Sequence, residues 1–241
     1  MDVTLDTMFR GRLVVRQEKG GYRFSVDAVL LAGLAGVQPE DRVVDLGTGC
    51  GIIPLILAYR KKGRSIVGLE IQSDLAELAE WNVSTNRFSD RIELRNLDFR
   101  KVSEYFQPQS FDVVLSNPPY RRLESGRINL HPQKAMARHE LAASIREVFA
   151  AGKFLLRWGG RLTVIYPATR LGHLLVTAQQ HGFSPKELTV IYSDASGGPA
   201  RLVCVECRKG GGEELQVKPP FFIYAGEGEY SAAMQALYVE V

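Results

Sequence analysis

A rigid polar turn holds the residues best suited to chemistry in this sequence. Asn117-Pro118-Pro119-Tyr120 directly follows an apolar run, residues 111–116, that predicts a buried strand. Two consecutive prolines fix φ twice and remove two N–H donors, so the chain must leave the strand stiff and extended. An amide, a free backbone carbonyl and an aromatic ring would then stand together at the strand's carboxyl end. Such a group can bind a flat molecule that bears an amine. For these four residues alone, a proline-rich turn is the simpler interpretation.

A glycine-rich segment follows an earlier predicted strand and opens a predicted helix. In Asp45-Leu46-Gly47-Thr48-Gly49-Cys50-Gly51 the glycines alternate with other residues, which lets the backbone bend tightly and a ligand approach closely. A dinucleotide site would need the pattern G-x-G-x-x-G, but its third glycine position is Ile52 here. A dinucleotide also presents an anionic pyrophosphate to the helix. The leading acid Asp45 better suits a cationic ligand such as S-adenosylmethionine.

Two further acids follow the next two predicted strands. Glu70 comes after the strand at 65–69, and Asp98 lies beyond the strand at 91–94. Glu70 could accept hydrogen bonds from both ribose hydroxyls of a nucleoside. Asp98 could accept one from an adenine amino group, with Phe99 beside the ring. Each acid alone has a simpler interpretation as a helix N-terminal or cap residue. Three acids at successive strand ends, however, predict one shared crevice.

The remaining sequence alternates between predicted strands and helices, which indicates βαβ units and a parallel sheet. Strands are predicted at residues 42–46, 65–69, 91–94, 111–116 and 162–166, and an antiparallel pair at 188–192 and 202–207. Helices are predicted from Ile52, from a cap at Ser73 or Asp74, at 140–157 with a stop at Gly159-Gly160, and at 170–181. Before this alternation, residues 13–24 predict a hairpin turned by Gly20-Gly21, and residues 27–35 predict a short helix.

Length and composition are those of a globular protein. The chain has 241 residues, of which 45% are hydrophobic and 24% charged, and its net charge is +3. No apolar run approaches the ~20 residues of a membrane span, and no secretory signal is visible, so we expect a cytoplasmic protein without a membrane partner.

Cys204 and Cys207 stand three residues apart on a predicted strand, so their side chains should face opposite sides. Because no second Cys or His pair lies nearby, we expect core thiols and no metal site.

The motifs together resemble those of the class I S-adenosylmethionine-dependent methyltransferases. The glycine segment with Asp45, then Glu70, Asp98 and Asn117-Pro118-Pro119-Tyr120, match that superfamily in order and spacing. The Asn-Pro-Pro-Tyr form narrows the resemblance to the amino methyltransferases. Residues 21–32 and 45–55, together with 219–224 and 228–230, are similar to the bacterial tRNA1(Val) adenine-N6-methyltransferase family, which modifies the adenine beside the anticodon.

The resemblance implies an α/β fold of the Rossmann-like seven-stranded class I methyltransferase type. Its sheet is mostly parallel with an antiparallel C-terminal strand and helices on both faces. We expect a single domain over residues 1–241, in which residues 1–36 form an N-terminal hairpin and helix lid and residues 37–241 the catalytic core. We expect a monomer or weak homodimer. The expected contacts to S-adenosylmethionine, with S-adenosylhomocysteine as product, are Tyr22, Phe24 and Asp27 as a lid over the methionine end, and Asp45, Gly47, Thr48, Gly49, Gly51, Glu70, Asp98, Phe99 and Asn117.

The resemblance also assigns the catalytic turn. An exocyclic aromatic amine is a poor nucleophile because its lone pair is delocalised into the ring. The side-chain oxygen of Asn117 and the carbonyl oxygen of Pro118 would accept its two N–H groups and localise that lone pair. Tyr120 would stack on the base, and no strong general base is needed. A basic stretch follows the turn and would hold RNA phosphates; its members are Arg121, Arg122, Arg127, Lys134 and Arg138.

Three alternatives remain open at this level. A protein glutamine N5-methyltransferase also uses Asn-Pro-Pro-Tyr, but would carry a larger helical N-terminal domain. A guanine-N2 rRNA methyltransferase usually has a Phe or a similar ring at the fourth position of the turn. The third alternative is an inactive RNA-binding module that keeps the fold, against which the intact Asn117, Glu70 and Asp98 argue.

A second basic group is expected to be a solvated face; its members are Arg60, Lys61, Lys62 and Arg64.

Overall fold

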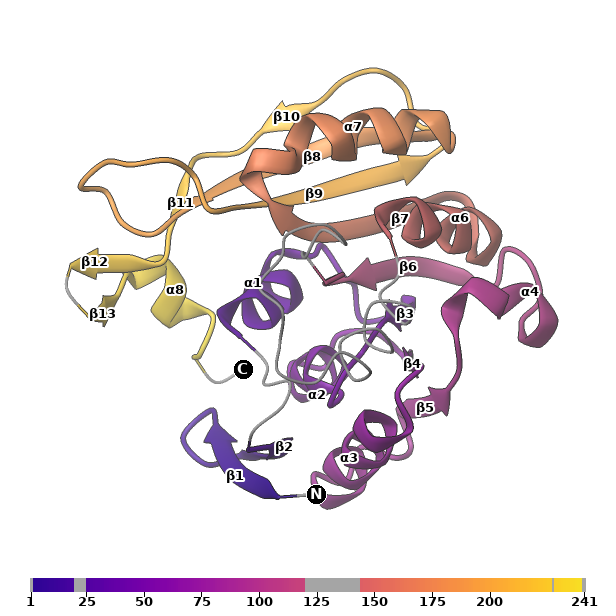
Figure 1. Ribbon diagram of the computed structural model, residues 1–241, viewed down its shortest axis with the longest axis vertical. Helices are drawn as coiled ribbons and strands as arrows, with labels where there is room; N and C mark the ends of the chain where they lie inside the picture. The colour runs from indigo at the N-terminus through magenta and orange to yellow at the C-terminus, as the bar shows by residue number, and fades with distance from the viewer. Residues whose placement is uncertain (1, 20–24, 120–143, 227, 240–241) are drawn as a thin grey trace, which may run out of the picture.

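A computed structural model describes residues 2–19, 25–119, 144–226 and 228–239 of the chain (Figure 1). Its centre is a sheet in the order β5-β4-β3-β6-β7-β9-β8, with β10 and β11 both paired to β8 at the edge. Every pair in it is parallel except those of β9, which runs antiparallel to β7 and β8. The predicted mostly parallel sheet is confirmed. Its strands are β3 (Arg42–Leu46), β4 (Ser65–Glu70), β5 (Ile92–Asn96), β6 (Phe111–Ser116), β7 (Leu156–Pro167), β8 (Phe183–Tyr192), β9 (Leu202–Lys209), β10 (Gln216–Val217) and β11 (Phe221–Phe222).

Helices cover both faces of the sheet and close two separate hydrophobic cores (Figure 1). The core on one face includes side chains of α1 (Val26–Leu34), α2 (Ile52–Tyr59) and α3 (Ser73–Thr85). The core on the other face includes side chains of α4 (Val102–Tyr105), α6 (Ile145–Leu155) and α7 (Leu171–Gln180). Cys204 belongs to the first core and Cys207 to the second, as their spacing on β9 predicts. Parallel strands are buried on both faces, which explains their nearly continuous apolar runs.

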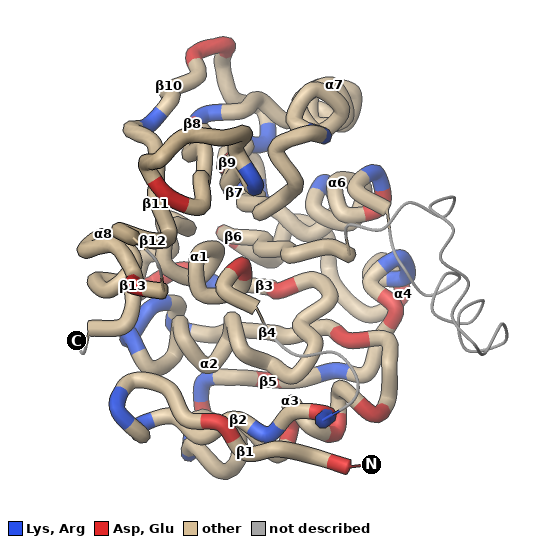
Figure 2. The backbone as a smooth tube through the Cα atoms, turned by 60° about the vertical axis from the view of Figure 1, so that its left-hand side comes forward, with Lys and Arg blue, Asp and Glu red and all other residues tan. Residues whose placement is uncertain are grey.

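An N-terminal hairpin lies before the position at which the sequence predicts one. β1 (Val3–Met8) pairs with β2 (Leu13–Glu18), so this hairpin turns at residues 9–12. The predicted turn at Gly20-Gly21 lies outside the described residues. Phe9, Arg10 and Gly11 have φ of +50°, +55° and +84°, and a left-handed phenylalanine is unfavourable. Burial of its ring, stacked on Tyr59 at 4.5 Å, compensates for that strain. The hairpin packs beside α3 (Figure 2).

Three helix boundaries also differ from the expected ones. α3 begins at Ser73 without a side-chain cap, because Gln72 occupies the N-cap position. α6 starts after Ser144, whose side chain forms a capping box with Glu147. It ends at Leu155 instead of at the glycines, because the next residue already pairs with Phe111 in the sheet.

The shorter elements are η1 (Phe99–Lys101), η2 (Ala168–Arg170), β12 (Tyr224–Gly226), β13 (Glu229–Tyr230) and α8 (Ala232–Ala236). None of the helices among the described residues has the length and hydrophobicity of a membrane-spanning segment.

Candidate cofactor and amine site

The glycine segment and the Asn-Pro turn leave the sheet side by side. β3 and β6 are parallel neighbours, and Leu46 lies opposite Ser116 in their register. The Ser116 hydroxyl donates to the backbone oxygen of Leu46 at 3.0 Å, which fixes the two strand ends together. Gly47 and Asn117 are therefore the first residues beyond two matched strand ends. Asn117 is half-buried, and Pro118 is buried.

The conformation of the glycine loop requires glycine. Gly47, Gly49 and Gly51 all have left-handed φ, at +75°, +59° and +80°. The N–H groups of Gly47 and Thr48 both donate to the oxygen of Leu69 at 2.9 Å, which ties the loop to the end of β4. A Cβ added at Gly47 would meet nothing within 4 Å. The loop thus leaves open space in front of its first turn, where a ligand can approach the backbone.

Glu70 is held rigidly at the end of β4. It is only 5% exposed, and its Oε2 accepts the N–H of Gly49 at 2.8 Å. Its Oε1 accepts the N–H of Gln72 at 2.9 Å. Oε1 also accepts a long hydrogen bond of 3.5 Å from the Gln72 side-chain amide. Oε2 has a second lone pair, so it can still accept a hydrogen bond from a ligand hydroxyl. Asn96, at the end of β5, donates to the Glu70 backbone oxygen at 2.8 Å, a contact for which the sequence carries no signal.

Asp45 is the acid of the site whose charge is least compensated by its surroundings. It is fully buried, and neither carboxylate oxygen has a hydrogen-bond partner among the described residues. Burial raises the pKa of Asp45 to about 7; the nearby Thr48 hydroxyl, although it forms no well-oriented hydrogen bond, lowers it, and the charge of Glu70 raises it further. An unpartnered buried carboxylate is costly unless a cation joins it. The ammonium and sulfonium groups of S-adenosylmethionine are cations of this kind, so the loop fits that cofactor.

Asp98 is a helix cap with an arginine partner. Its Oδ1 accepts both the backbone N–H of Arg100 at 2.9 Å and the Nε–H at 2.8 Å, and its Oδ2 lies 2.7 Å from Nη2. These hydrogen bonds lower the pKa of Asp98. Phe99 is buried in the second core. The cap interpretation of Asp98 is therefore correct, and its expected contact with adenine stays a prediction, as does that of Phe99.

Several expected site residues lie outside the described part of the chain. Asp27 is described: it is half-buried in the first turn of α1, where its N–H donates to the Ser25 hydroxyl at 3.3 Å. Outside the described residues lie Tyr22, Phe24, Tyr120, Arg121, Arg122, Arg127, Lys134 and Arg138.

The second basic group is not uniformly a solvated face. Arg60 is half-buried, donates to the backbone oxygen of Leu237, and lies over the Phe9 ring at 5.7 Å. Desolvation lowers the pKa of Arg60. The expectation is therefore wrong for Arg60, which joins the C-terminal segment to the hairpin. Lys61 and Arg64 are exposed, as expected, whereas Lys62 is half-buried.

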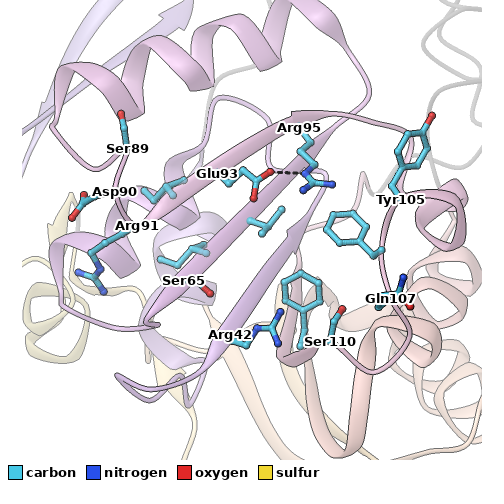
Figure 3. A pocket seen from close by; sticks show the side chains of 15 residues that line it. Arg42, Ser65, Ser89, Asp90, Arg91, Glu93, Arg95, Tyr105, Gln107 and Ser110 are labelled. Atoms are coloured by element: carbon cyan, nitrogen blue, oxygen red, sulfur yellow. Dashed lines mark hydrogen bonds and ion pairs between the residues drawn. The ribbon is translucent and has the colours of Figure 1, made fainter.

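A separate groove of about 530 Å³ lies at the opposite edge of the sheet (Figure 3). Arg42, Ser65 and Phe111, at the amino ends of β3, β4 and β6, line it, and Glu93 pairs with Arg95 there at 2.7 Å. None of the expected cofactor residues lines this groove. Within the described ranges no group of three potential metal ligands exists.

Comparison with known families agrees with this geometry. The family model of the methyltransferase small domain matches residues 27–171, which include the glycine loop, Glu70 and the Asn-Pro turn. This chain belongs to the methyltransferase small domain family. It is similar to a protein of Bacteroides thetaiotaomicron named tRNA1(Val) (adenine(37)-N6)-methyltransferase, with 32% identity over 80% of this chain and 79% of that one. A protein of Porphyromonas gingivalis with the same name is 31% identical over 80% and 77%. The predicted family resemblance is confirmed.

Solved structures show that the methyltransferase fold extends over most of the chain. A predicted O-methyltransferase from Agrobacterium tumefaciens has a TM-score of 0.70 and 22% identity, and covers 88% of this chain and 95% of that one. TYW2 from Pyrococcus horikoshii, in complex with MeSAdo, has a TM-score of 0.60 and 16% identity over 86% and 70%. At these identities the similarity establishes the fold of this methyltransferase.

Proposed function

We propose that this protein transfers a methyl group from S-adenosylmethionine to N6 of an adenine in tRNA, beside the anticodon in a tRNA of the tRNA1(Val) type. One observation supports the reaction most directly. β3 and β6 are neighbours that end opposite each other, so the glycine loop and the Asn-Pro turn leave the sheet side by side. The substrate assignment is supported by relatives of that name, which are 31–32% identical over four-fifths of the chain.

The cofactor end of the proposed site consists of acidic side chains and of glycine backbone that a ligand can approach. Bound S-adenosylmethionine supplies an electrophilic methyl group on a positively charged sulfur. Asp45 balances that positive charge, and Glu70, fixed by Gly49 and Gln72, accepts the ribose hydroxyls. Thr48 and the open face of Gly47 are assigned to the same end of the cofactor. Asp98 and Phe99 are assigned to the adenine end, and Tyr22, Phe24 and Asp27 to the methionine end.

The amine end of the proposed site is the turn after β6. The Asn117 side-chain oxygen and the Pro118 carbonyl accept the two N–H groups of the adenine amine, and Pro119 keeps the turn stiff. Tyr120 stacks on the base, an interaction that contributes about 1–3 kcal/mol in single-stranded nucleic acid binding. Alignment of two bound reactants can supply up to about 7–11 kcal/mol of the barrier. The methylated amine loses its proton to water.

The basic stretch after the turn is proposed to hold the RNA backbone. Its positive charges would neutralise phosphates on either side of the target adenine and release counterions. A salt titration of tRNA binding tests this, because phosphate contacts give a negative slope in log affinity against log salt. An affinity that does not change with salt would contradict this assignment. The residues concerned are Arg121, Arg122, Arg127, Lys134 and Arg138.

Mass spectrometry of tRNA nucleosides after incubation with the protein and S-adenosylmethionine tests the function directly. We expect N6-methyladenosine, and sequencing of the modified fragment should place it beside the anticodon. Methylated guanine in rRNA or methylated glutamine in a protein would favour the corresponding alternative enzyme. Cofactor binding without methylation of any of these substrates would support an inactive RNA-binding module.

A further inference from the structure

One buried amide joins the N-terminal hairpin to the back of the glycine loop. Asn82 lies on α3 and is 0% exposed. Its Oδ1 accepts the N–H of Arg16 at 2.6 Å, and its Nδ2 donates to the oxygen of Arg16 at 3.0 Å. The same Nδ2 donates to the backbone oxygen of Cys50 at 2.9 Å. Cys50 stands between two glycines of the loop, so a single side chain contacts β2 and the loop from α3.

Asn86 lies one helical turn after Asn82 and makes the same kind of contact with β2. The structure records no hydrogen bond from its side chain to the glycine loop. Asn86 accepts the N–H of Val14 at 2.9 Å and donates to the oxygen of Val14 at 2.7 Å. Two strand residues span about 6.6–6.8 Å and four helix residues rise about 6 Å, so the two amides meet β2 in register. Together they take the place of a neighbouring strand along β2, which lies beside α3 in both Figures 1 and 2.

The loop also rests directly on the same face of α3. A Cβ added at Gly51 would lie 3.2 Å from the Cβ of Ala79, which precedes Asn82 by one turn. On its other side the loop is held by Leu69 and Glu70 at the end of β4. The peptide of Cys50 is thus fixed between β4 in front and Asn82 behind, and Asn82 receives its position partly from the hairpin.

We propose that Asn82 is a positioning residue that couples the N-terminal hairpin to cofactor binding in the glycine loop. The inference rests on the proposed function, because it assigns the loop to S-adenosylmethionine. A ligand that immobilises the loop should stabilise the Asn82 hydrogen bonds and therefore the docked hairpin, and the docked hairpin should strengthen ligand binding by the same factor. Asn82 itself touches neither the cofactor nor the amine, so its effect on the reaction is indirect.

The first test compares Asn82→Ala with Asn86→Ala as a matched control. Both substitutions remove two hydrogen bonds to β2 and one further bond. The further bond of Asn82 goes to the Cys50 oxygen in the loop, whereas that of Asn86 goes to the backbone oxygen of Asn82 within α3, at 2.7 Å. We expect Asn82→Ala to raise the KM for S-adenosylmethionine about two- to tenfold, the range of one hydrogen bond, and to leave kcat within about twofold. Asn86→Ala should change neither by more than about twofold. Equal effects of both variants on KM would overturn the proposal, because they would indicate general loosening of the hairpin.

The second test uses the unaltered protein, so it does not depend on a variant that folds. Hydrogen exchange of the Arg16 amide, which donates to Asn82, is measured with and without S-adenosylhomocysteine. We expect saturating ligand to slow exchange at Arg16 more than at Val14, which donates to Asn86. Unchanged exchange at Arg16, with ligand binding confirmed by calorimetry, would contradict the coupling alone. Absence of calorimetric binding would instead contradict the proposed function.

Discussion

Gly49 donates its backbone N–H to Oε2 of Glu70 at 2.8 Å, so the acid that ends β4 also holds the loop that follows β3. The same carboxylate is expected to bind the ribose of the cofactor. Its position is therefore set before any ligand arrives, and little reorganisation is needed on binding. Loss of Glu70 should affect both the loop conformation and the ligand contact.

Replacement of Glu70 by Ala should weaken binding of S-adenosylhomocysteine strongly. Hydrogen bonds to a charged group contribute roughly 1.5–3 kcal/mol, so we expect an affinity loss of about tenfold to a hundredfold by calorimetry. Glu93→Ala is a suitable control, because Glu93 is an exposed carboxylate in the groove at the opposite edge of the sheet. Equal affinities for the Glu70 and Glu93 variants would remove Glu70 from the cofactor site.

Cofactor affinity should depend on the ionisation of Asp45. Its pKa is about 7 in the ligand-free protein, whereas a cationic ligand requires the ionised form. Affinity for S-adenosylmethionine, measured without tRNA, should therefore rise between about pH 5.5 and 7.5, by up to about tenfold per unit below the pKa. Asp45→Asn should bind more weakly, and with little pH dependence over this range. A flat profile in the unaltered protein would contradict the proposed charge balance.

The same buried carboxylate should lower the stability of the ligand-free protein as pH rises. The unfolded pKa of an aspartate is about 3.9 and the folded value is about 7, so between these values the native state binds more protons than the unfolded state. The contribution of Asp45 is thus least unfavourable below about pH 4 and most unfavourable above about pH 7. Asp45→Asn should raise Tm at pH 8 and have a smaller effect at pH 5. A lower Tm at pH 8 would show that Asp45 has a stabilising partner.

Asn117→Ala should abolish methyl transfer while cofactor binding survives. Removal of one preorganised hydrogen-bonding group at a reacting centre typically costs about 10²–10³ in kcat, and we expect a loss at the upper end. Single-turnover methylation of tRNA measures the loss, and calorimetry with S-adenosylhomocysteine shows whether the cofactor site is intact. Turnover near that of the unaltered protein would exclude Asn117 as an acceptor for the amine.

Arg60→Ala should destabilise the protein more than Arg64→Ala. Arg60 is half-buried, bonded to Leu237 and placed over Phe9, whereas Arg64 is exposed. Loss of these contacts should cost about 1 kcal/mol, which corresponds to roughly 2–4 °C in Tm for a chain of this size. Thermal unfolding followed by circular dichroism measures the difference. Indistinguishable Tm values would mean that Arg60 contributes no more than an exposed arginine.

Local sequence patterns are enough to predict the strands of the sheet and the strand ends at which the proposed site lies. Apolar runs predict the strands because parallel strands are buried on both faces, and the spacing of glycines, acids and prolines predicts which strand ends carry chemistry. Even the opposite faces of Cys204 and Cys207 follow from the period of a strand. These features depend on near neighbours along the chain, which a sequence displays directly.

The contacts between distant segments follow from the folded structure and not from local sequence patterns. The hairpin turns at Phe9 because its ring stacks on Tyr59, fifty residues away, and that burial outweighs an unfavourable φ. Asn82 joins the hairpin to the loop by the same kind of long-range contact, although as an asparagine within a helix it carries no distinctive signal in the sequence. Asp45 likewise becomes an isolated charge only when the folded core removes water from it. Burial and long-range pairing are properties of the packed chain, and local sequence patterns do not specify them.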